Sequence, residues 1–207
     1  SDVYKRQYSN NSTMRKSFSN FLIVIISFLY LSACAQYPSI EWQIRTAVLA
    51  CPEEFREQST VLGYQESGLL EVLRSGTNHM ICLADDPKTD GFSVSAYHSD
   101  LEPFMKRGRQ LKEEGLDFKT IFDTRESEAT SGSLKMPSRA TLYVLDGNIN
   151  KQTKEIENAY LRYVIYIPFA TPESTGLPTK PSTPSEPWIM DPGTHRAHIM
   201  ISPERNK

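Results

Sequence analysis

The sequence lacks an excess of charge of either sign, and it is poor in the residues from which metal and redox sites are built. Its 23 Lys and Arg residues nearly balance 25 Asp and Glu residues, for a formal net charge of −2. This balance gives no electrostatic argument for nucleic-acid binding or for a polybasic membrane patch. Only four histidines and three cysteines occur in 207 residues, so each of them can be weighed individually.

The common catalytic and nucleotide-binding motifs are also missing. The chain contains no G-x-S-x-G nucleophile elbow, no P-loop and no G-x-G-x-x-G, which leaves serine-hydrolase chemistry and nucleotide binding without motif support. No cofactor is expected on these grounds. Whether the protein is an enzyme stays open at this level.

The N-terminal region has the layout of an export signal. Residues 1–13 carry no apolar pattern, and Met14 directly precedes the basic pair Arg15 and Lys16, so we interpret residues 1–13 as a non-native upstream segment. The apolar run over residues 21–31 has the length of a signal-peptide core. It is shorter than the roughly 20 apolar residues of a membrane-spanning helix. We therefore predict a signal peptide over residues 14–33.

The residues that end this run are Leu31-Ser32-Ala33-Cys34. They resemble the lipobox of bacterial lipoproteins, in which the cysteine receives a diacylglyceryl group and becomes the first mature residue. The resemblance implies lipidation of Cys34 and attachment to a membrane through that lipid; the alternative is an ordinary signal peptide followed by an incidental cysteine. Ala35 and Gln36 follow Cys34, and neither is an aspartate. An aspartate at this place would resemble the inner-membrane retention signal of enterobacterial lipoproteins. The prediction is thus a cell-envelope protein on the outer membrane, facing the periplasm.

Residues 34–38 would form the anchor and a short tether, and residues 39–207 are long enough for one ordinary domain. In its first half, the spacing of apolar residues predicts a helix capped by Ser39 and a short helix over 52–58. Short β-branched and aromatic runs then predict strands whose tight connections favour an antiparallel meander; they cover residues 60–64, 69–74, 79–84 and 92–97.

In the second half, a helix capped by Asp100 is expected to end at Gly115. Helical spacing continues through residue 122, and residues 124–133 are expected to be mobile or a frayed helix. Strands are predicted over residues 140–145, 160–169 and 195–202, and no regular element over the proline-rich residues 171–193. These elements predict an α+β domain with helices on one face of a mainly antiparallel sheet.

Two cysteines remain in the predicted domain, Cys51 on a helix face and Cys82 in a strand. An exported protein meets conditions that permit disulfides, so the two could pair. Free cysteine also packs well as a small hydrophobe. The sequence leaves both possibilities open.

Candidate catalytic residues are weak, and they consist of His98, Asp100, Asp191 and His195. His98 and Asp100 lie between a strand and a helix, where polar groups often gather. Asp191 and His195 flank the last strand and could join them in a metal-dependent or hydrolase-like site. The pairs His79-x-x-Cys82 and His195-x-x-His198 make poor metal sites, because residues three apart on a strand face opposite sides.

The proline-rich connection offers candidate binding residues, namely Glu173, Ser174 and Trp188. Stiffened loops of this kind carry binding residues at low ordering cost. Equally, Trp188 and the apolar residues after it could simply cover the edge of the sheet.

Several segments of the chain are similar to segments of uncharacterised exported bacterial proteins; they cover residues 82–87, 98–104, 168–178 and 187–193. This resemblance brings no activity. The sequence as a whole therefore predicts an envelope lipoprotein that binds a small-molecule ligand or an envelope protein. The alternative is a periplasmic metal-dependent or hydrolase-like enzyme using His98, Asp191 and His195.

Overall fold

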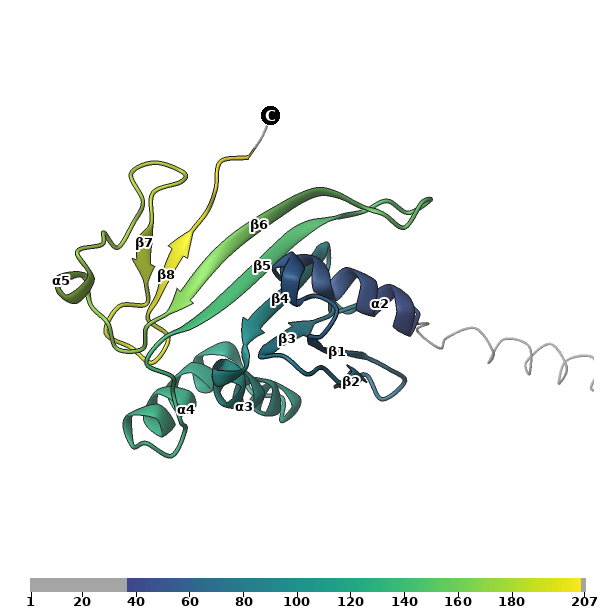
Figure 1. Cartoon of the computed structure of the whole chain (residues 1–207). Helices are drawn as coiled ribbons and strands as arrows, with labels where there is room; N and C mark the ends of the chain where they lie inside the picture. The colour runs from purple at the N-terminus through teal and green to yellow at the C-terminus, as the bar shows by residue number, and fades with distance from the viewer. Residues whose placement is uncertain (1–36, 206–207) are drawn as a thin grey trace, which may run out of the picture. The chain divides into compact units, whose positions relative to one another are not determined.

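The structure is a computed structural model and describes residues 37–205 (Figure 1). The predicted upstream segment 1–13, the predicted signal peptide 14–33 and Cys34, the predicted site of lipidation, lie outside the described residues. Within residues 37–205, no helix combines the length and the apolar character that crossing a bilayer requires.

Eight strands form one sheet within the described residues, in the order β2-β1-β3-β4-β5-β6-β8-β7. Neighbouring strands are antiparallel, except that β1 and β3 run parallel. The strands are β1 (Thr60–Tyr64), β2 (Leu70–Arg74), β3 (Met80–Leu83), β4 (Phe92–His98), β5 (Ala140–Ile149), β6 (Ile156–Tyr166), β7 (Trp188–Met190) and β8 (His198–Ile201).

The first four strands sit where the sequence predicted them, but they do not form the expected meander. After the β1–β2 hairpin, the chain crosses over the start of β1, and β3 pairs with β1 instead of β2. Gly76 makes the crossing possible, since a Cβ there would lie 2.3 Å from backbone atoms of Ser59 and Thr60. The amides of Thr77 and Asn78 then donate to the Gln58 carbonyl at 2.8 and 3.1 Å.

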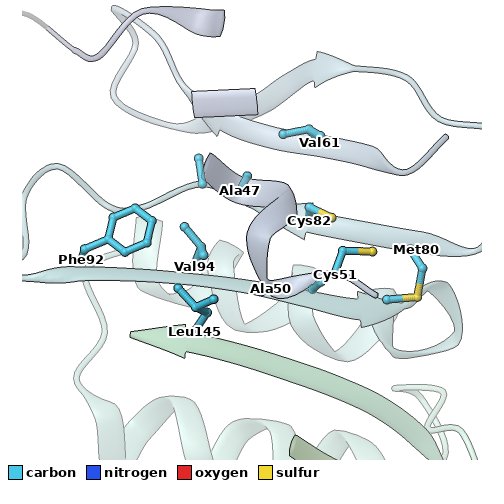
Figure 2. Close-up of a cluster of buried hydrophobic side chains, with 11 residues drawn as sticks. Ala47, Ala50, Cys51, Val61, Met80, Cys82, Phe92, Val94 and Leu145 are labelled. Atoms are coloured by element: carbon cyan, nitrogen blue, oxygen red, sulfur yellow. The ribbon is translucent and has the colours of Figure 1, made fainter. Parts of the chain in front are cut away.

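Helix α2 (Ile40–Ala47) continues into the 3₁₀ turn η1 (Val48–Ala50), and the Ser39 hydroxyl caps α2 by accepting the amide of Trp42, as predicted. The apolar side of α2 and η1 packs on the middle strands (Figure 2). Ala47, Ala50 and Cys51 are buried there against Val61, Cys82, Phe92, Val94, Ala96 and Leu145. The short helix predicted after Pro52 is a single 3₁₀ turn, η2 (Glu53–Phe55).

The opposite face of the sheet is covered by helix α3 (Glu102–Glu113), and helix α4 (Phe118–Thr130) packs on α3. Strand residues alternate between the two faces of a sheet. Tyr97 and Leu142 therefore face away from the first core and belong to a second core around Phe104. The single α+β domain with a mainly antiparallel sheet is thereby confirmed. The helices, however, are divided between both faces, whereas we expected them on one.

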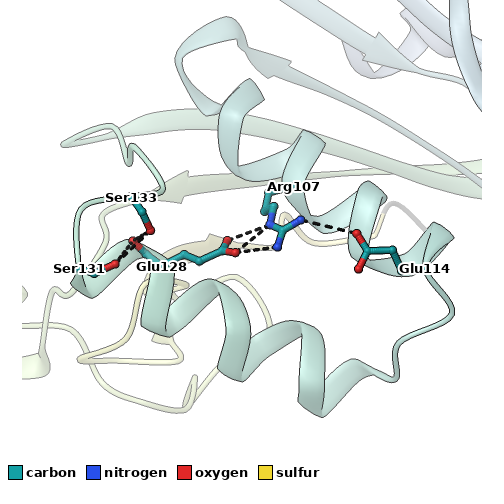
Figure 3. Close-up of polar contacts among 5 residues, drawn as sticks. All are labelled: Arg107, Glu114, Glu128, Ser131 and Ser133. Atoms are coloured by element: carbon teal, nitrogen blue, oxygen red, sulfur yellow. Dashed lines mark hydrogen bonds and ion pairs between the residues drawn. The ribbon is translucent and has the colours of Figure 1, made fainter.

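Two details of these helices differ from the sequence prediction. His98, and not Asp100, caps the 3₁₀ turn η3 (Ser99–Leu101) that leads into α3, because its ring accepts the Asp100 amide. The polar residues after 122 are not frayed; α4 runs on to Thr130. Arg107 of α3 holds that last turn through hydrogen bonds to both carboxylate oxygens of Glu128 (Figure 3).

The proline-rich connection contains two elements that the sequence did not predict. Helix α5 (Pro172–Thr175) is one turn, closed by a capping box in which Thr171 and Ser174 exchange side-chain and backbone hydrogen bonds. Strand β7 pairs with β8 and forms the sheet edge. Strand β8 begins three residues later than predicted, so His195 lies in the loop before it.

Candidate functional site

Two of the predicted site residues, His98 and Asp100, line the same open cleft at the end of β4. The cleft has a volume of about 310 Å³. It is lined by His98, Asp100, Arg139, Ala140, Thr141 and Ile165. Antiparallel pairing brings the start of β5 and the end of β6 beside the end of β4, which explains how residues from three strands meet here.

The His98 ring is held in place by two neighbours, Asp100 and His79. Its Nδ1 accepts the Asp100 amide at 3.2 Å, and the Asp100 carboxylate lies 3.5 Å from the same nitrogen. The ring also packs on His79 with centroids 4.8 Å apart, and His79 meets the edge of Phe55 at the same separation. Because Nδ1 is an acceptor, the neutral ring carries its proton on Nε2. His98 therefore presents a hydrogen-bond donor from a fixed position.

The cleft combines opposite charges over a partly apolar surface. The Arg139 guanidinium and the Asp100 carboxylate are both exposed, while Ala140 and Ile165 contribute apolar surface and Thr141 a hydroxyl. No cysteine or serine is among the lining residues. The arrangement is suited to binding through charge and hydrogen bonds, and it contains no nucleophile paired with a base.

His195 lies in a different environment, in the second core on the other side of the sheet. Its side chain is fully buried between the rings of Phe104 and Phe122. Burial lowers the pKa of His195, and the hydrogen bond to Glu126 opposes this shift only in part. The Nε2 atom is buried and has no hydrogen-bond partner among the described residues. His195 is thus placed to support the fold rather than to meet a substrate.

Asp191 and His195, the other two predicted catalytic residues, do not line the cleft that contains His98 and Asp100. Asp191 lies in the turn before β8, where its carboxylate oxygen is 3.5 Å from Arg196 Nε. His98 has the register of Ala96 and Val94, which face α2, whereas His195 contacts Phe104 on the α3 side. The sheet thus separates the two histidines. Among residues 37–205, no three His, Cys, Asp or Glu side chains are grouped to hold a metal ion.

The three candidate binding residues of the proline-rich connection serve local structure. Ser174 is occupied by the capping box. The exposed Glu173 interacts with the Thr171 hydroxyl, which lowers the pKa of the carboxyl. Trp188 packs against the second core from the edge strand β7, as in the alternative interpretation. None of the three lines the His98 cleft.

Sequence reasoning missed Arg139, Thr141, Ile165 and His79 as neighbours of His98. The predicted strands include His79, Thr141 and Ile165, and Arg139 directly precedes one of them, but the pairing of β4 with β5 joins residues more than forty positions apart. No local pattern specifies such a pairing. In comparisons with known proteins, no family model, curated protein or solved structure matches the chain.

Proposed function

We propose that this protein is a lipid-anchored protein of the cell envelope that binds a small carboxylate-bearing ligand in the His98 cleft. The anchoring half of the proposal is supported by the lipobox-like residues that end at Cys34. The binding half is supported by one observation, the meeting of His98 and Arg139 at an open cleft with an apolar floor.

The chemistry of the lining favours a carboxylate. Arg139 offers a planar fork of donors that matches a carboxylate group, and the Nε2 proton of His98 adds a further donor. Ala140 and Ile165 can contact an aliphatic or aromatic body. Asp100 disfavours a second negative charge near His98, so a monocarboxylate fits better than a dicarboxylate.

The geometry gives less support to the enzyme alternative. It required His98 to act together with Asp191 and His195, but His98 and His195 lie on different faces of the sheet, and Asp191 does not line the His98 cleft. A binding site needs no such convergence, because the cleft itself supplies the donors and the apolar surface.

The binding half is tested by thermal unfolding in the presence of a panel of short aliphatic and aromatic monocarboxylates. At least one should raise the melting temperature of the wild-type chain, and Arg139→Ala should abolish the increase. Lys135→Ala, which removes an exposed cation outside the cleft, should leave it unchanged. An increase equal in Arg139→Ala and wild type, or none with any compound, would refute binding at this cleft.

The anchoring half has its own test. Cells that express the wild-type chain should incorporate labelled fatty acid into it, and the protein should fractionate with membranes. Cys34→Ala should lose the label. A wild-type chain that takes up no label would contradict the anchor and leave the binding test unaffected.

A further inference from the structure

Cys51 and Cys82 meet in the core between η1 and the sheet. Cys51 directly follows η1, and Cys82 lies in β3, one of the inner strands. Their exposures are 1% and 0%, and both belong to the same buried cluster. Figure 2 shows the two sulfur atoms on facing sides of this interface. Their thiols are hydrogen-bonded to each other.

We propose that Cys51 and Cys82 are a disulfide-forming pair that joins η1 covalently to β3. The pairing closes a loop that contains the whole β1–β2 hairpin and the crossing at Gly76. Two thiols already in contact need little backbone movement to form a bond, and this is the usual requirement for a disulfide. The inference goes beyond the proposed binding function and does not depend on it.

The surroundings distinguish the two sulfurs. The hydrogen bond with Cys51 and the nearby Arg74 guanidinium lower the pKa of Cys82, whose thiol donates to the Ser59 hydroxyl at 3.4 Å. The pKa of Cys51 is raised in return, chiefly by its hydrogen bond to Cys82 and by burial. The thiolate is the attacking species in thiol–disulfide exchange.

The exchange needs a disulfide oxidant, such as oxidised glutathione or a disulfide oxidoreductase. The thiolate of one cysteine attacks one sulfur of the oxidant and expels the other as a thiolate, leaving a mixed disulfide. The second cysteine then loses its proton and attacks the protein sulfur of that mixed disulfide, which releases the second thiol. In total, two protein thiols lose two protons and two electrons, and the oxidant becomes two thiols. Since both sulfurs are buried, the exchange takes place while the chain folds.

The full chain can be tested directly in detergent after refolding in a glutathione buffer rich in the oxidised form. Free thiols are first blocked with iodoacetamide under denaturing conditions, and the chain is digested with trypsin without reduction. Cleavage after Arg45, Arg56, Arg74 and Lys88 places the two cysteines in peptides 46–56 and 75–88. We expect these peptides as one cross-linked species that separates on reduction. The Cys51→Ala variant should show peptide 75–88 only with a free or glutathione-bound thiol.

Separate peptides, each carrying iodoacetamide or glutathione in the refolded wild type, would overturn the inference. A thermal unfolding transition recorded before digestion establishes that the wild-type and Cys51→Ala chains are folded. Because the oxidant is supplied in solution, the result is independent of export and of ligand binding. A chain that is lipidated but keeps both thiols free would refute the disulfide and leave the proposed function standing.

Discussion

One carboxylate oxygen of Glu126 accepts two hydrogen bonds from His195, at 2.8 Å from the backbone nitrogen and 2.5 Å from Nδ1. Glu126 belongs to α4, and His195 to the loop before β8. The pair therefore ties a helix from the middle of the chain to the loop before its last strand. Nearby, His198 stacks on Tyr166 and donates from Nδ1 to the Arg196 carbonyl at 2.6 Å.

These two buried histidines predict that acid destabilises the fold. Burial lowers the pKa of His195 and of His198 below the ordinary value of 6.5, which each regains on unfolding. The unfolded chain then binds more protons than the folded chain, so the free energy of unfolding should fall as the pH drops through about 6.5 toward the folded-state pKa values. Urea unfolding at pH 7.5, 6.5 and 5.5 measures this dependence.

A variant pair checks which histidines are responsible. His195→Gln combined with His198→Gln should flatten the pH dependence in this window, even if it lowers stability at every pH. His79→Gln, which changes an exposed histidine, should keep it. An unchanged pH dependence in the double variant would contradict the assignment.

The ion pair between Arg107 and Glu128 should contribute measurably to the packing of α3 against α4. Arg107 donates from Nε and Nη2 to both oxygens at 2.7 to 3.0 Å, and the side chains are 29% and 26% exposed. A double-mutant cycle with Arg107→Ala and Glu128→Ala should give a coupling free energy of about 1 kcal/mol, reduced by high salt. The control is the far more exposed Lys119–Asp123 pair, for which a smaller coupling is expected because solvent screens exposed charges. Equal coupling in both pairs would contradict the prediction.

Gly76→Ala should destabilise the protein by about 1–3 kcal/mol, the usual cost of forcing an extra carbon into a filled space. The new Cβ would meet the backbone of Ser59 and Thr60, which cannot move aside as a flexible side chain can. Chemical unfolding of Gly76→Ala beside Ser75→Ala, an exposed neighbour, measures the difference. A Gly76→Ala variant as stable as Ser75→Ala would show that the crossing tolerates a side chain.

The parts of the fold that local chemistry determines were predictable from the sequence. The hydroxyl cap at Ser39 and the end of α3 at Gly115, with φ +81, follow from neighbouring residues. The crossing of the chain at Gly76 was not predictable, because the residues of this turn allow β3 to pair with either β1 or β2. The last turn of α4 was missed for a related reason, since Glu128 meets its partner Arg107 only in the folded protein.

The same distinction holds for the site. His98 was predicted as a site residue because it ends a strand and precedes a helix, and it does line a cleft. Arg139 directly precedes β5, and its place beside His98 depends on strand pairing across a long stretch of chain. The expected partnership of His98 with His195 failed because the sequence does not show which face of the sheet each residue takes.

The contacts of α2 bear on when this protein can fold. Trp42 donates from its indole nitrogen to the Lys154 carbonyl at the tip of the β5–β6 hairpin, and the core under α2 includes Phe92 and Leu145. Two of the partners of α2, Leu145 and Lys154, are therefore synthesised about a hundred residues after the helix itself. The earlier strands β1, β3 and β4 already offer α2 part of its core, but Leu145 and the Lys154 carbonyl do not. The packing of α2 is therefore complete only after the second half of the domain has been synthesised.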